Sequence, residues 1–202
     1  MTILTDAQLL KLLSTKRLIV HPILSLGQIN GTKIDLRLGY EIFMVKRFQQ
    51  PVYDPMDVNI RESDVGEEVG VPMRSMGLVL HPGDFALAPL FESVRMPDDL
   101  VGRIDGRSSL GRLGIIVHAT AGIVDPGFSG IIVCELSNLG KVPVALYPLM
   151  RIAAISFEQL DAPVARLYSK RPRRKHAQVL YTKLSNDYEF REGVLKRLRD
   201  KV

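Results

Sequence analysis

The chain has 202 residues, of which 46% are hydrophobic and 24% are charged, enough for one substantial hydrophobic core. No apolar stretch approaches the roughly 18 residues that a membrane-spanning helix needs, and residues 1–6 lack the basic and apolar regions of a secretory leader. We therefore expect one soluble domain over residues 1–202, located in the cytoplasm and not bound to a membrane.

The cysteine count and the net charge narrow the function further. Cys134 is the only cysteine, which excludes an intrachain disulfide framework and a cysteine-based metal cluster within one chain. The net charge is +5, and basic residues concentrate at positions 170–175 and 196–201. This distribution suits a polyanionic partner, either nucleic acid or the triphosphate of a nucleotide, although a solvated tail would look the same.

The chain begins with the pattern of a capped helix. Thr5 is a good N-cap, Gln8 completes a capping box three residues later, and Leu4 can pack against Leu9. One apolar face is expected from the leucines that follow, namely Leu9, Leu10, Leu12 and Leu13.

After this helix the pattern becomes that of β-strands. Apolar side chains at 34, 36 and 38 alternate with charged ones at 33, 35 and 37, as in a half-buried strand. Short apolar runs follow at 76–80, 85–90, 115–119, 130–136, 142–146 and 152–157, separated by turn-forming residues. This spacing favours a β-sandwich or a jelly-roll-like barrel over a parallel α/β sheet. Residues 49–75 are rich in Asp, Glu, Pro and Gly, and we expect them to form a surface excursion.

A glycine-flanked loop at residues 106–111 has the composition of a phosphate site. Arg107, Ser108, Ser109 and Arg112 supply two guanidinium groups and two hydroxyls that could converge on phosphate oxygens. The loop is not a Walker motif, because no Gly-Lys-Ser/Thr follows at the required spacing. An ordinary surface turn could have the same residues.

Two carboxylates downstream are candidate catalytic or binding groups. Asp125 opens a Pro-Gly turn, where it could bind a sugar hydroxyl, orient a water or simply form the turn. Glu135 lies inside an apolar run at 131–136, where partial loss of solvent would suit a proton shuttle. An outward-facing glutamate in an alternating strand is the alternative.

Taken together, these motifs resemble the dCTP deaminase family of the dCTP deaminase/dUTPase superfamily. The resemblance covers most of the chain. It begins at the N-terminal capped helix, continues through residues 29–39, 81–83 and 100–102, and is most specific at 106–112, 120–121, 125–127 and Glu135. It implies an all-β, distorted jelly-roll or β-barrel of the dUTPase type with short terminal helices. It also implies a homotrimer with active sites at the subunit interfaces, and a C-terminal tail or lid and helix from about 165 to 202.

The resemblance also implies roles for individual residues. Glu135 would be the general acid and base, while Arg112, Ser108 and the Ala121 carbonyl would position the attacking water. Asp125 would meet the deoxyribose 3′-hydroxyl. The triphosphate would be held by Arg107, Ser108, Ser109, Leu110, Gly111 and Arg112.

The rest of the implied site comes from a strand and from the tail. Val133, Cys134 and Glu135 would line the cytosine, and the tail would contribute Tyr168, Lys175 and Gln178. At the tail the pattern departs from the family, because His176 follows Lys175 where an aromatic Tyr is usual, and Gln178 falls one residue early. Arg171, Arg173 and Arg174 could compensate in holding the triphosphate.

The implied deamination needs no zinc. Zinc deaminases hold a metal-activated water with a His-x-Glu and a Pro-Cys-x-x-Cys, and neither motif is present. Mg²⁺ would be bound only through the nucleotide triphosphate, with no protein metal ligand. We expect the histidines to be structural, with His81 in a turn and His118 at the end of a buried strand.

Several alternatives remain open at the level of the sequence. The first expectation is conversion of dCTP to dUTP and ammonia, and the sequence leaves open whether dTTP is an inhibitor. A bifunctional enzyme would also hydrolyse dUTP to dUMP and pyrophosphate, and the Gly122 that follows Ala121 is similar to such members, whereas Ala119 is not. A plain dUTPase would leave Glu135 without a role and has Tyr where Phe128 stands. A nucleotide sensor or nucleic-acid-binding module is disfavoured, because exposed aromatics are not interleaved with the basic residues.

Overall fold

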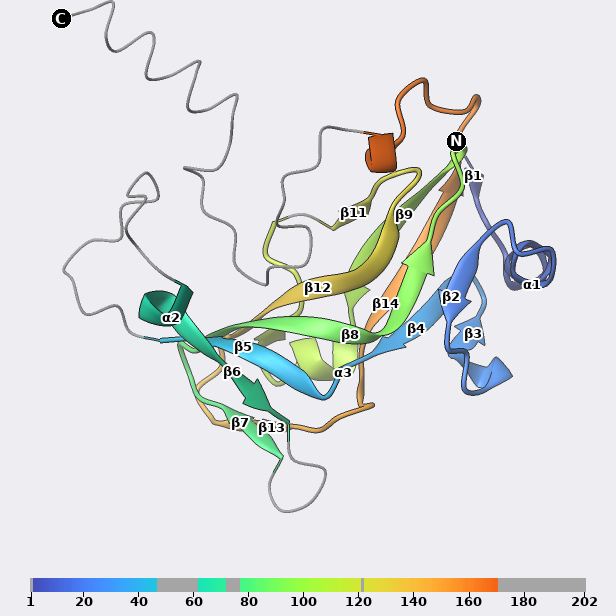
Figure 1. The fold of residues 1–202 in the computed structure, drawn as a ribbon. Helices are drawn as coiled ribbons and strands as arrows, with labels where there is room; N and C mark the ends of the chain where they lie inside the picture. Colours follow the sequence, from blue (N-terminus) through green and yellow to red (C-terminus); the bar gives the residue numbers. More distant parts are fainter. Residues whose placement is uncertain (1, 47–61, 72–76, 121, 171–202) are drawn as a thin grey trace, which may run out of the picture.

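Antiparallel β-sheets make up most of the structure, a computed structural model that describes residues 2–46, 62–71, 77–120 and 122–170 (Figure 1). One six-stranded sheet has the order β11-β9-β14-β4-β3, with β1 paired to β14. A second six-stranded sheet has the order β10-β12-β8-β5-β6, with β2 paired to β8, and β13 pairs with β7. The expected mainly β architecture is confirmed.

The strands are short except at the centre of each sheet. The first sheet contains β1 (Thr2–Ile3), β3 (Ile29–Asn30), β4 (Lys33–Arg37), β9 (Leu100–Gly106), β11 (Ile123–Val124) and β14 (Arg151–Gln159). The second contains β2 (Ile19–His21), β5 (Glu41–Val45), β6 (Gly66–Gly70), β8 (Phe85–Arg95), β10 (Ile115–Ile116) and β12 (Ser129–Asn138). The small sheet contains β7 (Leu78–Leu80) and β13 (Val144–Leu146). The helical segments are α1 (Asp6–Ser14), η1 (Leu26–Gln28), α2 (Glu62–Val65), α3 (Ser108–Gly111) and η2 (Tyr168–Lys170). None of the described helices is both long and apolar enough to cross a bilayer.

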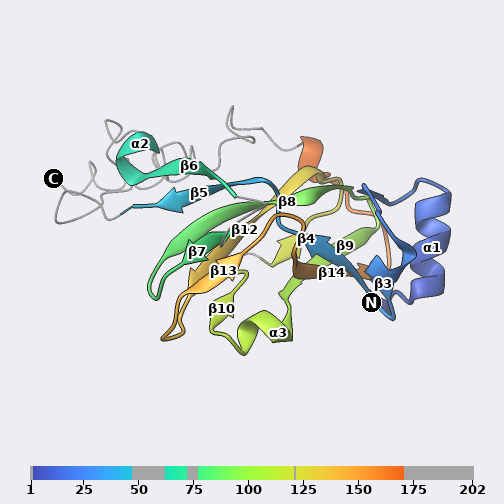
Figure 2. The same ribbon diagram turned by 90° about the horizontal axis from the view of Figure 1, so that it is seen from below.

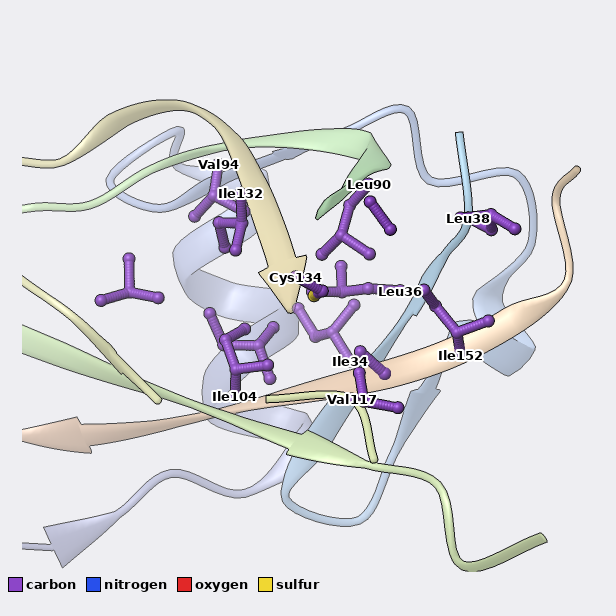
Figure 3. Packing of buried hydrophobic residues seen from close by; sticks show 14 of the residues in the cluster. Ile34, Leu36, Leu38, Leu90, Val94, Ile104, Val117, Ile132, Cys134 and Ile152 are labelled. Carbon is purple, nitrogen blue, oxygen red and sulfur yellow. The ribbon is translucent and has the colours of Figure 1, made fainter. Parts of the chain in front are cut away.

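Figure 2 shows the two large sheets from below, and the hydrophobic core is built from buried side chains of both of them. Strand β12 alternates strictly, so that Ile132 and Cys134 are buried while Val133 is only half-buried. Figure 3 shows Ile132 and Cys134 directed toward Ile104 and Ile34 of the facing sheet. This two-residue period is the physical reason that one face of β12 builds the core and the other is left for a site.

Helix α1 forms as its sequence predicts, with one exception. The capping box between Thr5 and Gln8 is present, and Leu9 is fully buried. Leu12 and Leu13 pack partly against the core, but Leu10 is 44% exposed. The expectation that Leu10 belongs to the apolar face is wrong, because the helix turns it toward solvent.

The expected surface excursion at 49–75 is partly built into a sheet. Residues 66–70 form β6, which pairs with β5 at the edge of the second sheet. Residues 49–61 and 72–75 lie outside the described part of the chain.

A buried polar cluster links the two large sheets. Glu92 on β8 is fully buried, its Oε2 accepts the Arg37 backbone N–H at 2.8 Å, and its Oε1 lies 3.7 Å from Arg37 Nη1. Gln28 Nε2 donates to Glu92 Oε1 at 3.0 Å and to the Asp35 carbonyl at 3.0 Å. Burial raises the pKa of Glu92 above its ordinary value, and the bonds from Arg37 and Gln28 oppose this only in part. The cluster fixes β4, and therefore Asp35, relative to β8.

Candidate active site

Glu135 lies on the face of β12 that points away from the core. Glu135 and Val133 line a pocket, whereas the Cys134 side chain between them is fully buried among core residues (Figure 3). Burial, with a smaller contribution from the negative charge of Glu135, raises the pKa of the Cys134 thiol to about 12. Any contact of Cys134 with a substrate would therefore come from its main chain.

The carboxylate of Glu135 is held by the segment that follows β10. Oε2 accepts the backbone N–H groups of Ala119 and Thr120, each at 3.2 Å, and the Thr120 hydroxyl at 3.2 Å. Oε1 lies 3.4 Å from that hydroxyl. Because β10 pairs with the end of β12, the chain beyond β10 passes directly over Glu135. These donors fix one oxygen and leave the other less engaged within the described residues.

The pocket beside Glu135 has a volume of about 230 Å³ and carries a second carboxylate. Asp125 follows β11, and its carbonyl accepts the Phe128 backbone N–H at 3.1 Å, which closes the expected turn. The remaining lining residues are five aliphatic and three aromatic side chains, and the full set is His118, Ile123, Val124, Asp125, Phe128, Ile131, Ile132, Val133, Glu135 and Tyr168. A mostly apolar concavity with two carboxylates suits a small ligand that has a flat ring and polar edges.

Tyr168 joins this pocket from the far end of the described chain. Its backbone N–H donates to the Pro126 carbonyl at 3.0 Å, and its ring centroid lies 5.6 Å from that of Phe128. Gly127 permits the approach, because a Cβ there would lie 2.9 Å from the Leu167 Cβ and Gly127 has a φ of +79°. The structure thus brings together Asp125, Val133, Glu135 and Tyr168 of the expected site residues.

Sequence reasoning did not assign His118 and Thr120 to the site. His118 lines the pocket, and its Nδ1 is buried without a hydrogen-bond partner in the described structure. The expectation that His118 ends a buried strand is wrong, because β10 ends at Ile116. In the sequence, His118 and Ala119 directly precede the 120–121 motif, which is the one hint that this segment belongs to the site. Only the backbone path shows that the segment crosses Glu135.

The glycine-flanked loop with the composition of a phosphate site, residues 106–112, forms one tight helical turn and is called the α3 loop from here on. The Arg107 carbonyl accepts the N–H groups of Leu110 and Gly111, both at 3.0 Å. Leu110 is buried and anchors the turn, while the Ser108, Ser109, Gly111 and Arg112 positions are exposed. Arg107 is half-buried and forms an ion pair with Asp35. The loop therefore presents hydroxyl and guanidinium groups to solvent, as its composition predicts.

This loop and the pocket are separate within one chain. None of Arg107, Ser108, Ser109, Leu110, Gly111 and Arg112 lines the pocket. Figures 1 and 2 both show α3 well apart from the red-orange turn that contains Tyr168. Ala121, Lys175 and Gln178, together with the rest of the expected tail beyond residue 170, lie outside the described residues.

The described part of the chain offers no group of three or more His, Cys, Asp or Glu side chains that could hold a metal ion. Asp125 and Glu135 are the two carboxylates of the pocket, and the exposed residues at 108–112 are two serines, a glycine and Arg112. This donor set is compatible with a divalent cation that arrives on the phosphates of a ligand, since Mg²⁺ is often held largely by substrate phosphates and water.

Comparison with solved structures places this fold beside a nucleotide deaminase. The crystal structure of 2′-deoxycytidine 5′-triphosphate deaminase from Agrobacterium tumefaciens superposes with a TM-score of 0.61 at 26% identity. The match covers 78% of this chain and 47% of that one, so the chain spans about half the length of the crystallised protein.

Curated relatives are more similar in sequence. Proteins named "dCTP deaminase, dUMP-forming" from Dictyoglomus turgidum and Methanosphaera stadtmanae are 47% and 43% identical over 177 and 176 residues, which is 86% of this chain in each case and 89% and 87% of the relatives. A protein named "dCTP deaminase" from Haloarcula marismortui is 44% identical over 169 residues, 82% of this chain and 85% of its own length.

The family model described as "dCTP deaminase-like" matches residues 3–160, a span that includes α1 through β14, Glu135 with its donors, the Asp125 turn and the α3 loop. With relatives above 40% identity over more than four fifths of the sequence, this chain belongs to the dCTP deaminase-like family of enzymes.

Proposed function

We propose that this protein deaminates dCTP and that Glu135 is the general acid and base of the reaction. The observation that carries the proposal is the position of Glu135 at a pocket of about 230 Å³, with one carboxylate oxygen fixed by Ala119 and Thr120. A carboxylate held in this way can exchange a proton with a ligand without losing its orientation.

The proton balance of the reaction fits one carboxylate. Glu135 takes a proton from a water molecule as the water oxygen bonds to C4 of cytosine, and delivers it to N3 of the ring. It then accepts the remaining proton of that oxygen and passes it to the amino group, which leaves as ammonia. The product is dUTP. Oε1 is suited to this exchange, because Oε2 already accepts three hydrogen bonds.

The sugar and base are assigned to the same pocket. Asp125 receives the deoxyribose 3′-hydroxyl, and the main chain of Val133 and Cys134 runs along the cytosine. Tyr168, whose ring packs against that of Phe128 at an interplanar angle of 52°, closes one side. In this arrangement the apolar lining excludes bulk water from the ring, which strengthens the electrostatic effect of Glu135.

The triphosphate is assigned to the α3 loop. Arg107, Ser108, Ser109 and Arg112, with the backbone at Leu110 and Gly111, bind its oxygens, and Lys175 and Gln178 of the tail at 165–202 cover it. The nucleotide phosphates would hold Mg²⁺, whose positive charge would offset theirs. Arg112, Ser108 and the Ala121 carbonyl also position the attacking water.

A homotrimer explains how these two half-sites could serve one nucleotide. In one chain the α3 loop does not line the pocket that contains Glu135, yet deamination of a triphosphate requires both. We infer that the α3 loop of one subunit faces the pocket of its neighbour, within a single-domain subunit in the cytoplasm. An inhibitory nucleotide such as dTTP would occupy the same place.

The second step, hydrolysis of dUTP to dUMP and pyrophosphate, is part of the proposal. Sequence alone placed the dUTP-producing enzyme first, but relatives at 43% and 47% identity are named dUMP-forming. Gly122 supports this choice as well. A Cβ at position 122 would lie 3.2 Å from the Ile104 carbonyl oxygen and 3.8 Å from His118 Cδ2, so a larger residue would crowd the pocket wall.

Product analysis tests both steps. The protein is incubated with dCTP and Mg²⁺, and nucleotides are separated by anion exchange. We expect dUMP and pyrophosphate from the wild type, unchanged dCTP with Glu135→Gln, and wild-type products with Glu67→Gln, which alters an exposed glutamate on β6. Accumulation of dUTP would refute the proposed hydrolysis of dUTP, and unchanged dCTP with the wild type would refute the deaminase proposal.

A further inference from the structure

A second arginine, Arg151, lies beside Arg107 of the α3 loop. Arg107 Nη1 forms an ion pair with Asp35 Oδ1, and Arg151 Nη1 lies 2.9 Å from Asp35 Oδ2. One carboxylate therefore bridges two guanidinium groups. Arg151 also donates to the Gly27 carbonyl at 3.4 Å.

Backbone contacts place these three residues together. The Arg107 backbone N–H donates to the Ile152 carbonyl at 3.3 Å, so the loop begins next to Arg151. Asp35 lies on β4, the strand paired with β14. Its carbonyl accepts a hydrogen bond from Gln28 of the buried polar cluster. Asp35 and Arg151 thus lie on paired strands, which position side chains more accurately than a loop can.

The charges in this group do not cancel. Two guanidinium groups face one carboxylate, which leaves a surplus of one positive charge, and the nearby Lys33 is balanced by Asp105 at 3.8 Å. The Asp35 side chain is 14% exposed, whereas those of Arg107 and Arg151 are 33% and 40% exposed. The carboxylate therefore lies underneath and the cations lie toward solvent.

Each arginine retains hydrogen-bonding capacity. A guanidinium group has five N–H donors, and within the described residues Arg151 directs them only to Asp35 and Gly27. Two adjacent planar forks with spare donors and a net positive charge match the oxygens of a polyphosphate.

We propose that Arg151 is a second cation of the triphosphate site and that Asp35 is the positioning residue that holds Arg107 and Arg151 side by side. The inference rests on the proposed function, because it concerns the phosphates of the same nucleotide. It adds a residue from β14 to a phosphate site otherwise confined to α3 and the tail.

Steady-state kinetics with dCTP separate a phosphate contact from a structural ion pair. Arg151→Ala should raise KM about tenfold, the loss of a charge-assisted hydrogen bond, with kcat within about twofold of wild type. The KM of Arg151→Lys should lie between those of the wild type and Arg151→Ala. The matched control is Arg17→Ala, because Arg17 also forms an ion pair with a mostly buried aspartate, Asp99. An unchanged KM in Arg151→Ala would overturn the proposal.

Binding of inorganic tripolyphosphate, measured by calorimetry, does not depend on turnover. We expect weaker binding by Arg151→Ala and unaltered binding by Arg17→Ala. If the wild type binds tripolyphosphate through Arg151 but leaves dCTP unchanged, the deaminase proposal fails and this one stands. Equal binding by the wild type and Arg151→Ala would refute the inference alone.

Asp35→Asn tests the positioning role. If Asp35 orders the two arginines, its loss should weaken tripolyphosphate binding even though a negative charge has been removed. If Asp35 merely competes with phosphate for the arginines, the same variant should bind tripolyphosphate more tightly, and the positioning role would be wrong. Thermal unfolding of each variant confirms that it is folded.

Discussion

At residue scale, the alternation of side chains along β12 directs three consecutive residues to two different environments, the pocket and the hydrophobic core. Val133 and Glu135 face the pocket and Cys134 faces the core. The sequence places an acid in an apolar run, but only the strand register decides that the acid points out and the thiol points in. A one-residue shift would exchange their environments.

The Cys134 thiol should therefore be unreactive in the folded protein. Its pKa is raised to about 12 by burial and by the Glu135 charge, so almost no thiolate exists at pH 8. Because the chain has one cysteine, labelling with a thiol reagent gives an unambiguous result. We expect no labelling at pH 8 under native conditions and complete labelling in denaturant. Rapid native labelling would contradict the buried position.

Thr120 should affect the catalytic step more than substrate binding. Its hydroxyl lies 3.2 Å from Glu135 Oε2, so Thr120→Val removes one of the bonds that orient the carboxylate but retains the backbone N–H. We expect kcat to fall about threefold to tenfold, equivalent to a hydrogen bond of ordinary strength, with KM for dCTP little changed.

Thr120→Ser is the variant that restores the hydroxyl, and its kcat should approach that of the wild type. The control is Thr15→Val, since the Thr15 hydroxyl donates to the helix carbonyls of Lys11 and Leu12, far from Glu135 in the sequence. If Thr120→Val matched the wild type in kcat, the backbone donors alone would suffice to hold Glu135.

At the scale of elements, local patterns predicted some segments better than others. The capping box predicted α1, and the apolar run at 130–136 predicted most of β12. Strand β9 was not predicted, because charged side chains at Arg103 and Asp105 interrupt its apolar residues. Strand β8 continues past the predicted run to Arg95, since Glu92 is stabilised in the core by Arg37, a partner 55 positions away.

The candidate site was likewise predicted only where the local sequence pattern is informative. The local sequence pattern was enough to select Glu135, Asp125 and the α3 loop as candidates. An acid within an apolar run and arginines among glycines can be recognised without knowledge of the fold. His118 and Thr120 depend on where the chain crosses after β10, and Arg151 depends on the pairing of β14 with β4. Such contacts between distant segments are set by tertiary packing.

The buried Glu92 between β4 and β8 should give stability a specific pH dependence. Its pKa is raised above the ordinary 4.5 by burial, so the native state binds this proton more tightly than the unfolded state. The free energy of unfolding therefore falls as pH rises from about 4.5 through the folded pKa. Glu92→Gln cannot titrate, so the wild type should lose stability relative to this variant across that window.

Urea unfolding of both proteins at a series of pH values measures the difference. The control is Glu67→Gln, which removes an exposed carboxyl paired with Lys46, and whose difference from wild type should vary little over the same range. A wild-type to Glu92→Gln difference that stayed constant with pH would mean that the Glu92 pKa is not raised in the folded protein.

At the scale of the whole molecule, the separation of α3 from the Glu135 pocket predicts complementation between subunits. If the α3 loop of one subunit completes the pocket of its neighbour, Glu135→Gln and Arg112→Ala destroy opposite halves of each site. Either variant alone should be inactive. A mixed trimer can contain interfaces at which one chain supplies an intact Arg112 and the other an intact Glu135.

Co-expression of the two variants with different affinity tags, followed by sequential purification, isolates such mixed trimers. In a cyclic trimer with two copies of one variant and one of the other, one interface in three pairs the two intact halves, so the activity of the purified mixed trimers should approach about one third of wild type. Co-expressing Glu135→Gln with Glu135→Ala controls for assembly itself and should remain inactive. If the Glu135→Gln and Arg112→Ala mixture also stays inactive although mixed trimers form, both halves must come from one chain. The C-terminal tail or a rearranged α3 would then have to bring them together.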